Sequence, residues 1–309
     1  MSAVIATDRL TKRYGDVVAV DGLSLRVEQG EIYGFLGVNG AGKSTTIRML
    51  LGMVQPSGGS VQLFGTHVRP GAGRVWSHVG YLMEAPTAYP ELTVTENLEL
   101  ARRLRGIPDR RSVARVMERL ALAPYANHTA RSLSSGNLQR LGLTKALLHE
   151  PDLLILDEPA NGLDPAGVVQ VRELLRALAF EQGVTVFMSS HILGEVARLA
   201  TRLGIIHRGR LLEQLSAAEL KRRQRRRLIV DTRDRPSTRR VLTGAGLTFA
   251  QQDHDGALEL TDQRAVEHPD EIARLLVEAG NPPITLRVEQ EDLETHFLRL
   301  ITAQQDGRR

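Results

Sequence analysis

The sequence predicts an α/β protein whose mainly parallel sheet is followed by a small α+β domain. Short apolar segments typical of buried strands alternate with helical patterns over the first two thirds of the 309 residues. A glycine-rich turn lies between one of these strands and the next helix. A basic run at residues 221–227, KRRQRRR, then marks a change of pattern.

The N-terminal part begins with strands separated by turn signals. Gly15-Asp16 and Asp21-Gly22 are the turns. Strands are predicted at residues 3–8, 17–27 and 31–36, and the helix after the glycine-rich turn at residues 45–51. Further helices are predicted at 96–123, with a break at Gly106-Ile107-Pro108, and at 138–149, 168–180 and 193–199. Buried strands are predicted at 153–156 and 184–189.

The region after the basic run has its own order of elements. Strands are predicted at 228–231, 247–251, 257–260 and 284–288, and helices at 237–245, 271–279 and 293–301. We therefore predict one domain at residues 1–220, a basic linker at 221–227 and an accessory α+β domain at 228–309.

Composition narrows the class of protein. With 42% hydrophobic and 25% charged residues, the chain can bury a core. No segment has the roughly 18 consecutive apolar residues of a membrane span, and the first ten residues show no secretory signal. The absence of cysteine excludes disulfides and cysteine metal sites, and it suits a reducing cytoplasm. The net charge of +4 is compatible with nucleic-acid binding, with anionic lipid or with solubility alone; solubility is the favoured interpretation, and no nucleic-acid partner is expected.

The clearest local motif is a phosphate-binding loop. It fits G-x4-G-K-[ST] and comprises Gly37, Val38, Asn39, Gly40, Ala41, Gly42, Lys43, Ser44 and Thr45. Glycines let the backbone approach phosphates closely, and the amides at a helix start face negative charge. Lys43 would reach the β- and γ-phosphates and Ser44 would bind Mg²⁺. A purely structural glycine turn is the alternative, and the strand before and the helix after the motif argue against it.

Two further polar groups follow buried strands. Asp157 and Glu158 end the strand at 153–156, so their side chains point to different faces. Asp157 suits a Mg²⁺ shell, and Glu158 could polarise a water aimed at the γ-phosphate. His191 follows the strand at 184–189, at the sheet edge where such folds bind ligands. In isolation, an Asp-Glu pair is commonly a solvated turn and a histidine is commonly structural.

Taken together, these residues resemble the nucleotide-binding domains of ABC transporters over about residues 3 to 215. The resemblance implies a P-loop NTPase fold with an ABC-type ATPase core and a helical subdomain at about residues 87–150. It assigns Tyr14 to adenine stacking, residues 37–45 to the Walker A loop and 153–158 to Walker B with its catalytic glutamate. Residues 161–164 match the D-loop and His191 the switch histidine. Catalysis would then depend on Lys43, Glu158 and His191, with ATP and Mg²⁺ bound.

The family signature, usually LSGGQ, is matched by Leu133-Ser134-Ser135-Gly136-Asn137. In the family, the residues at the positions of Ser134 and Gly136 bind the γ-phosphate held by the opposite subunit. The resemblance therefore implies a dimer of ATPase subunits, identical or different, related by a two-fold axis. By itself the segment would be an ordinary helix start.

Several positions depart from the family pattern. Ser135 replaces a glycine and Asn137 a glutamine of the signature, while Ala160 replaces a common hydroxyl residue. Glu84 stands where most members have glutamine, and its carboxylate could still bind Mg²⁺. None of these changes removes a charge that hydrolysis needs.

The branch of the family can be narrowed further. Glu84 and residues 89–93, 161–165 and 291–300 resemble the bacitracin- and lantibiotic-resistance exporters and their drug-exporter relatives, which favours export over import. The resemblance implies a separate polytopic transmembrane subunit docked at about residues 87–150. It also implies a cytoplasmic location, peripheral on the inner face of the cell membrane. The basic run at 221–227 could contact lipid headgroups there.

Two alternatives stay open at this point. One is a soluble ABC ATPase of translation or DNA repair, although such proteins commonly carry two cassettes or long insertions. The other is a regulatory module that no longer hydrolyses ATP, which the changes at Ser135 and Glu84 keep open.

Overall fold

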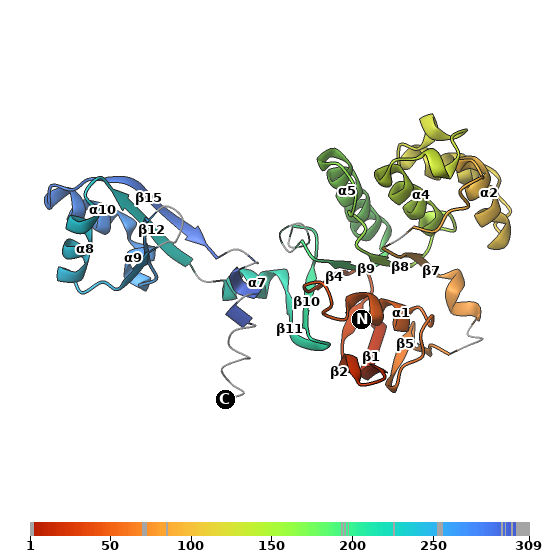
Figure 1. Ribbon diagram of the computed structural model, residues 1–309, viewed down its shortest axis with the longest axis horizontal. Helices are drawn as coiled ribbons and strands as arrows, with labels where there is room; N and C mark the ends of the chain where they lie inside the picture. Colours follow the sequence, from red (N-terminus) through yellow and green to blue (C-terminus); the bar gives the residue numbers. More distant parts are fainter. Residues whose placement is uncertain are drawn as a thin grey trace. The chain divides into compact units, whose positions relative to one another are not determined.

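The computed structural model of the chain divides into two compact units, Met1–Ala217 and Ala218–Arg309 (Figure 1). It describes all residues except 1–2, 70–72, 85, 193, 195, 197, 225, 252–255, 292, 294, 298 and 301–309.

The first unit is built on a mainly parallel sheet in the order β11-β10-β4-β9-β8-β7. Every residue of β4, β8 and β9 is buried, which explains why these strands are apolar runs rather than alternating patterns. Strand β11 pairs antiparallel with β10, and the other neighbouring strands pair in parallel. The strands are β4 (Ile32–Leu36), β7 (Val79–Leu82), β8 (Leu153–Asp157), β9 (Thr185–Ser190), β10 (Arg202–His207) and β11 (Arg210–Ser216).

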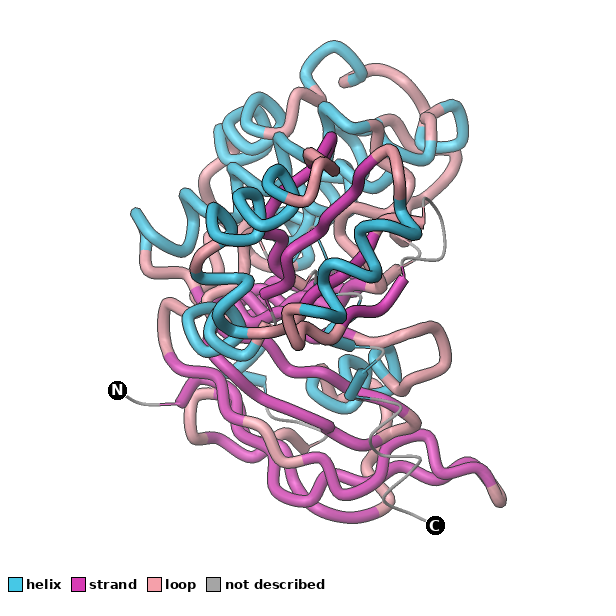
Figure 2. Tube along the Cα trace, turned by 90° about the vertical axis from the view of Figure 1, so that its left-hand side faces the viewer, coloured by secondary structure: helices cyan, strands magenta, loops and turns pink. Residues whose placement is uncertain are grey.

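A second, antiparallel sheet is formed by the N-terminal region. Its order is β2-β1-β5-β6, and β3 also pairs with β1. The first strand is longer than the prediction of residues 3–8, and the predicted strand at 17–27 is split between β2 and β3. The strands are β1 (Ala3–Tyr14), β2 (Val17–Leu23), β3 (Arg26–Glu28), β5 (Gly58–Leu63) and β6 (Thr66–His67). Figure 2 shows the N-terminal strand in the strand-rich part of the unit.

Helices cover both faces of the parallel sheet. Helix α1 (Lys43–Leu50) lies between the two sheets and contacts β8 and β5. On the opposite face, α4 (Ser135–Leu147) packs on β7 and α5 (Pro165–Gln182) on β9 (Figure 1). In the core, the rings of Tyr33 and Phe187 are stacked with centroids 5.4 Å apart.

The helical subdomain joins β7 to β8. It contains α2 (Val94–Leu104), α3 (Arg111–Arg119) and the short 3-10 helices η2 (Ala123–Tyr125) and η3 (Ala130–Ser132), before α4; another 3-10 helix, η1 (Gly73–Ser77), precedes β7. Thr93 and Glu96 form a capping box at the start of α2. The break expected at Gly106-Ile107-Pro108 separates α2 from α3. The helix predicted at 193–199 lies partly outside the described residues.

Strands β5, β7, β10 and β11 were not predicted, and glycines account for part of this. Gly80 lies in β7, where a Cβ atom would be 2.2 Å from the carbonyl oxygen of Ala146 in α4. Gly204 lies in β10, where a Cβ would be 2.2 Å from the hydroxyl of Tyr33. Close packing requires glycine at both positions, and glycine weakens the sequence signal for a strand.

The second unit is a small antiparallel sheet with helices. The sheet order is β13-β14-β12-β15, and its core includes Leu228, Val230, Leu242 and Leu260. The elements are α7 (Ala217–Arg223), β12 (Arg226–Thr232), α8 (Arg235–Gly244), β13 (Phe249–Gln251), β14 (Leu258–Leu260), α9 (Gln263–Glu267), α10 (Pro269–Glu278) and β15 (Pro283–Gln290). The helix predicted at 293–301 lies partly outside the described residues.

Most residues of the basic run lie in a helix or a strand, whereas a linker was predicted. Lys221, Arg222 and Arg223 end α7, and Arg226 and Arg227 begin β12. Arg227 pairs with Glu259 at 2.8 Å and Glu289 at 3.3 Å, on the strands to either side. Arg227 is therefore held within the sheet by cross-strand ion pairs. The amino-acid composition of the run does not show such pairs, because the partners lie far away in the sequence.

Candidate functional site

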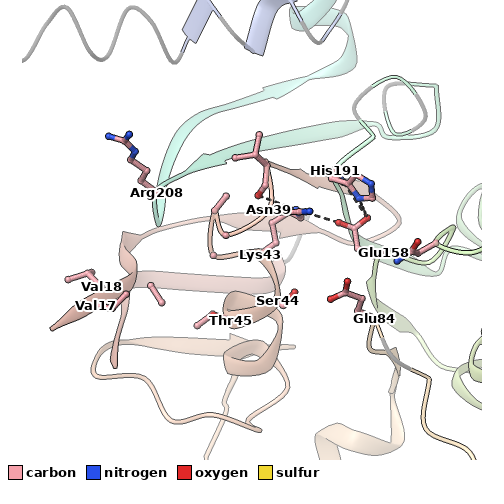
Figure 3. A pocket seen from close by; sticks show the side chains of 16 residues that line it. Val17, Val18, Asn39, Lys43, Ser44, Thr45, Glu84, Glu158, His191 and Arg208 are labelled. Carbon is pink, nitrogen blue, oxygen red and sulfur yellow. Dashed lines mark hydrogen bonds and ion pairs between the residues drawn. The ribbon is translucent and has the colours of Figure 1, made fainter. Parts of the chain in front are cut away.

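A pocket of about 810 Å³ lies at the carboxyl edge of the parallel sheet (Figure 3). Loops after β4, β8 and β9 meet there, as open α/β sheets arrange their ligand sites. The lining residues are Val17, Val18, Ala19, Val38, Asn39, Gly40, Ala41, Gly42, Lys43, Ser44, Thr45, Glu84, Glu158, Asn161, His191 and Arg208.

The loop from Gly37 to Gly42 connects β4 to α1 and requires its glycines. A Cβ on Gly42 would be 2.5 Å from the carbonyl oxygen of Ala19, and Gly42 has φ 107°. A Cβ on Gly37 would be 2.5 Å from the carbonyl oxygen of Ile206. Helix α1 starts at Lys43 with no side-chain cap and no acidic residue in its first turn. The first amides of α1 therefore have no partner from a capping side chain or from an acidic residue of the same turn, and such amides can bind an anion.

Lys43 is buried and turns back over its own loop. Its Nζ donates to the carbonyl oxygen of Gly37 at 2.6 Å and lies 3.4 Å from Glu158 Oε1. The ammonium group is thus fixed between the phosphate loop and the carboxylate at the end of β8 (Figure 3). A cation held in this place can stabilise charge on a phosphoryl group.

Asp157 and Glu158 differ in their surroundings, as strand alternation predicts. Asp157 is fully buried, and its Oδ1 accepts a hydrogen bond from Ser189 Oγ at 2.6 Å. The same Oγ accepts from the amide of Glu158 at 3.0 Å. Ser189, on the adjacent strand β9, therefore aligns both acidic residues.

His191 contacts Glu158 directly. Its Nδ1 lies 2.9 Å from Glu158 Oε2, and its amide donates to the same oxygen at 3.3 Å. Because a carboxylate only accepts, Nδ1 carries the proton in this contact. The ring can then donate a second hydrogen bond from Nε2 only as an imidazolium.

Asp157, Ser44 and Glu84 carry oxygen atoms of the kind that bind a divalent cation. Asp157 Oδ2 is buried and has no hydrogen-bond partner among the described residues. Ser44 and Glu84 line the pocket, and Figure 3 shows the Glu84 carboxylate directed toward Ser44. Carboxylate and hydroxyl oxygens are the ligands that Mg²⁺ prefers.

The residues that line this pocket do not include four predicted binding residues, Tyr14, Gly37, Ser134 and Gly136, or the predicted metal ligand Asp157. Tyr14 is 47% exposed, and its ring lies 5.0 Å from the Lys12 ammonium, although it pairs with the pocket residue Val17. Ser134 caps α4 by accepting from the amide of Asn137 at 3.3 Å, and Gly136 follows in the same helix. If Ser134 and Gly136 bind the nucleotide of a neighbouring subunit, they are expected to lie outside the pocket of their own subunit.

Several other residues of the site were not predicted from the sequence. Val17, Val18 and Ala19 follow the Tyr14 turn, and Arg208 lies in the turn between β10 and β11, which were not predicted. Ser189 directly follows a buried apolar run. Its place at the end of a predicted strand is the sequence feature that could have indicated a role in the site.

Comparison with known proteins identifies the family. Residues 20–161 match the family described as ABC transporter. The bacitracin transport ATP-binding protein BcrA of Bacillus licheniformis is 38% identical over 302 residues, which is 97% of this chain and 98% of that protein. BcrA of Enterococcus faecalis is 37% identical over 301 residues, with 97% of each chain covered. The chain belongs to the ABC transporter ATP-binding proteins.

Solved structures support the same family. The ATP-binding subunit of an ABC transporter superposes with a TM-score of 0.65 at 28% identity, covering 71% of this chain and 92% of that one. MJ0796, a bacterial ABC transporter cassette solved as a dimer, gives a TM-score of 0.64 at 25% identity, covering 69% and 98%. The predicted ABC-type ATPase core is confirmed, as is the function of an ATP-hydrolysing transporter subunit. Among the residues that the structure describes, no helix is long and apolar enough to cross a bilayer.

Proposed function

We propose that this ABC ATPase hydrolyses Mg·ATP in the pocket between the phosphate loop and the ends of β8 and β9. The observation that supports this most strongly is the chain of contacts from Lys43 through Glu158 to His191, with distances of 3.4 and 2.9 Å. Glu158 would accept the proton of a water that attacks the γ-phosphate. Lys43 and His191 would steady the transferred phosphoryl group.

Bound Mg²⁺ would neutralise charge on the β- and γ-phosphates. Ser44, Asp157 and Glu84 are the residues proposed to hold it, because Asp157 Oδ2 is buried without a partner in the described part of the chain. The adenine is proposed to stack on Tyr14, whose ring is exposed and whose backbone pairs with that of the pocket residue Val17. Base stacking of this kind contributes about 1–3 kcal/mol.

The working unit is proposed to be a dimer in which Ser134 and Gly136 of one subunit cover the γ-phosphate of the other. The exposed position of Ser134 at the start of α4, away from its own pocket, supports this arrangement. The two ATPase subunits could be two copies of this chain or a pair of different cassettes. A separate polytopic transmembrane subunit would dock on the helical subdomain, on the cytoplasmic face of the membrane.

Export of an antibiotic, drug or peptide is the proposed direction and cargo class. The two relatives that match the chain over nearly its whole length are both named as bacitracin transport ATP-binding proteins. Cargo specificity belongs to the membrane subunit, so the test is ATPase stimulation in vesicles. We expect a candidate membrane partner to raise turnover, and its cargo to raise it further. Turnover that never responds to a membrane partner would favour a soluble role.

The catalytic assignment is tested by Glu158→Gln. The variant keeps the size of the side chain and removes the base, so kcat should fall by about 10²–10⁴-fold while ATP affinity is retained. Glu181→Gln, an exposed change on α5, is the matched control and should leave kcat unchanged. Robust turnover by the Glu158 variant would contradict the proposed mechanism.

A further inference from the structure

Glu158 has a strained backbone that the surrounding residues hold in place. Its φ of 51° lies in the left-handed region, which is unfavourable for a side chain of this kind. Such a conformation costs about 1–3 kcal/mol and persists where neighbours impose it. The position of the Glu158 carboxylate therefore depends on the groups that bind its main chain.

Both main-chain polar groups of Glu158 have partners. The amide donates to Ser189 Oγ at 3.0 Å. The carbonyl oxygen accepts from Gln139 Nε2 at 3.0 Å and from the amide of Asn161 at 3.0 Å. Of these two donors to the carbonyl, Gln139 is the one that comes from another part of the fold, because it lies in α4.

Gln139 is itself fixed by burial. It is 2% exposed, and it lies five residues beyond Ser134, the residue that caps α4. A buried amide group in this position satisfies its hydrogen bond only while α4 and the Glu158 loop keep their spacing. The helix that begins with the signature segment is thus bonded directly to the backbone of the proposed base.

Two further contacts join α4 to the same loop. Ser135 Oγ donates to the carbonyl oxygen of Gly162 at 3.3 Å. Arg140 Nη2 lies 4.0 Å from Asp164 Oδ1. Ser135 stands where the usual signature has glycine, so its hydroxyl adds a contact that glycine could not make. The start of α4 and residues 158–164 therefore form one connected set of polar contacts.

We propose that Gln139 is a positioning residue that links the signature helix to the catalytic carboxylate through the main-chain carbonyl of Glu158. The inference rests on the proposed function, because it takes Glu158 as the base. Movement of α4 when the signature engages a partner's nucleotide changes the Gln139–Glu158 hydrogen bond. Glu158 then becomes aligned for the water only when the signature is engaged.

Gln139→Met tests this link. Methionine has a similar length and no donor, so the carbonyl of Glu158 loses one of its two bonds while the core stays filled. We expect kcat to fall by about tenfold from misplacement of the base, with the KM for ATP and the melting temperature nearly unchanged. Thr144→Val is the control, because Thr144 is also buried in α4 and bonds only to Arg140 of its own helix among the described contacts.

Gln139→Glu provides a second readout if the methionine variant folds poorly. Its carboxylate faces a carbonyl oxygen and cannot donate, but the protonated acid can. We expect its kcat relative to the unmodified protein to rise as the pH is lowered from about 8 to about 6, the side on which a buried carboxyl gains its proton. A relative rate that does not change with pH overturns the proposal.

The proposed link also predicts non-additive effects. Adding Gln139→Met to a Glu158→Asp variant should lower kcat by less than it does in the unmodified protein, because both changes act on the same base. An unchanged kcat for a well-folded Gln139→Met overturns the inference, as does a fall in kcat that is matched by a raised KM at an unchanged melting temperature. If Glu158→Gln keeps full turnover, the proposed function itself fails, so the two failures are distinguishable.

Discussion

The two units of this chain differ in how far packing explains their residues. In the second unit, Thr232, Thr238 and Asn281 bond to one another in a buried network, and the leucines around Leu260 fill one core. In the first unit, the pocket holds residues that packing does not need: a buried ammonium on Lys43 and a left-handed glutamate at Glu158. Residues that packing does not require, such as these two, therefore indicate where the functional site lies.

The largest effect on ATP binding is expected from a single methyl group in the phosphate loop. Gly42→Ala would place Cβ 2.5 Å from the carbonyl oxygen of Ala19, at a φ of 107°. We expect ATP affinity to fall by about 100-fold as the loop is displaced, because the loss of a close phosphate contact is costly. Calorimetric titration with ATP would measure it.

The matched change in the second unit is Gly246→Ala. Gly246 also has a positive φ of 74°, but no heavy atom lies within 4 Å of its ideal Cβ. This change should cost about 1 kcal/mol of stability and leave ATP binding unaltered. Equal effects of the two glycine changes on ATP binding would remove the contrast between the units.

The second effect concerns the metal. Asp157→Asn keeps the bond from Ser189 in place but removes the negative charge behind Oδ2. We expect the Mg²⁺ concentration for half-maximal ATPase activity to rise about tenfold, as the loss of an anionic ligand predicts. Asp152→Asn, an exposed change just before β8, is the control. An unchanged Mg²⁺ requirement would place the ion elsewhere.

The third effect tests whether the units are independent. Leu260→Ala opens a cavity in the core of the second unit, where Leu260 is fully buried, and should cost about 2–5 kcal/mol. Urea unfolding should show a shift in one transition only, and kcat should not change. Val277→Ala, at a position 56% exposed on α10, is the control. A lowered kcat would show that the second unit supports catalysis.

The smallest effect is expected at the basic run. Lys221, Arg222 and Arg226 are exposed, whereas Arg227 is held by two glutamates. If the run contacts anionic headgroups, Lys221→Glu should weaken binding to phosphatidylserine vesicles by a few-fold, and added salt should weaken it further. Arg274→Glu on α10 is the control. Vesicle binding that does not depend on salt would contradict contact with headgroups and would indicate that the run is only a solvated surface.

The sequence predicted the parts of the site that depend on local pattern. The phosphate loop needs glycines and a lysine at fixed spacing, and Asp157, Glu158 and His191 each follow a buried apolar run. The partners of Glu158 could not be found in this way, because Gln139 and Ser189 lie 19 and 31 residues from it along the chain. Their contacts arise only when α4 packs on β7 and β9 pairs with β8.

The same reasoning explains the errors in the fold. Strands with uniform apolar character, such as β8 and β9, were found because both faces are buried. Strands β7 and β10 each contain a glycine that close packing requires, so their signal was weak. The basic run was taken for a linker because the glutamates that pair with Arg227 lie on strands distant in sequence.

The central claim is that two subunits share each γ-phosphate, and cross-linking tests it most directly. The chain has no cysteine, so Asn39→Cys and Ser135→Cys introduce the only two thiols. In a Glu158→Gln background, ATP with Mg²⁺ should bring the thiol introduced in the phosphate loop of one copy to the thiol introduced in the signature segment of the other. Oxidation should then yield a covalent dimer. The account predicts this product with ATP and little of it without nucleotide. A yield that is the same with and without ATP would contradict the sharing of a γ-phosphate between two copies of this chain.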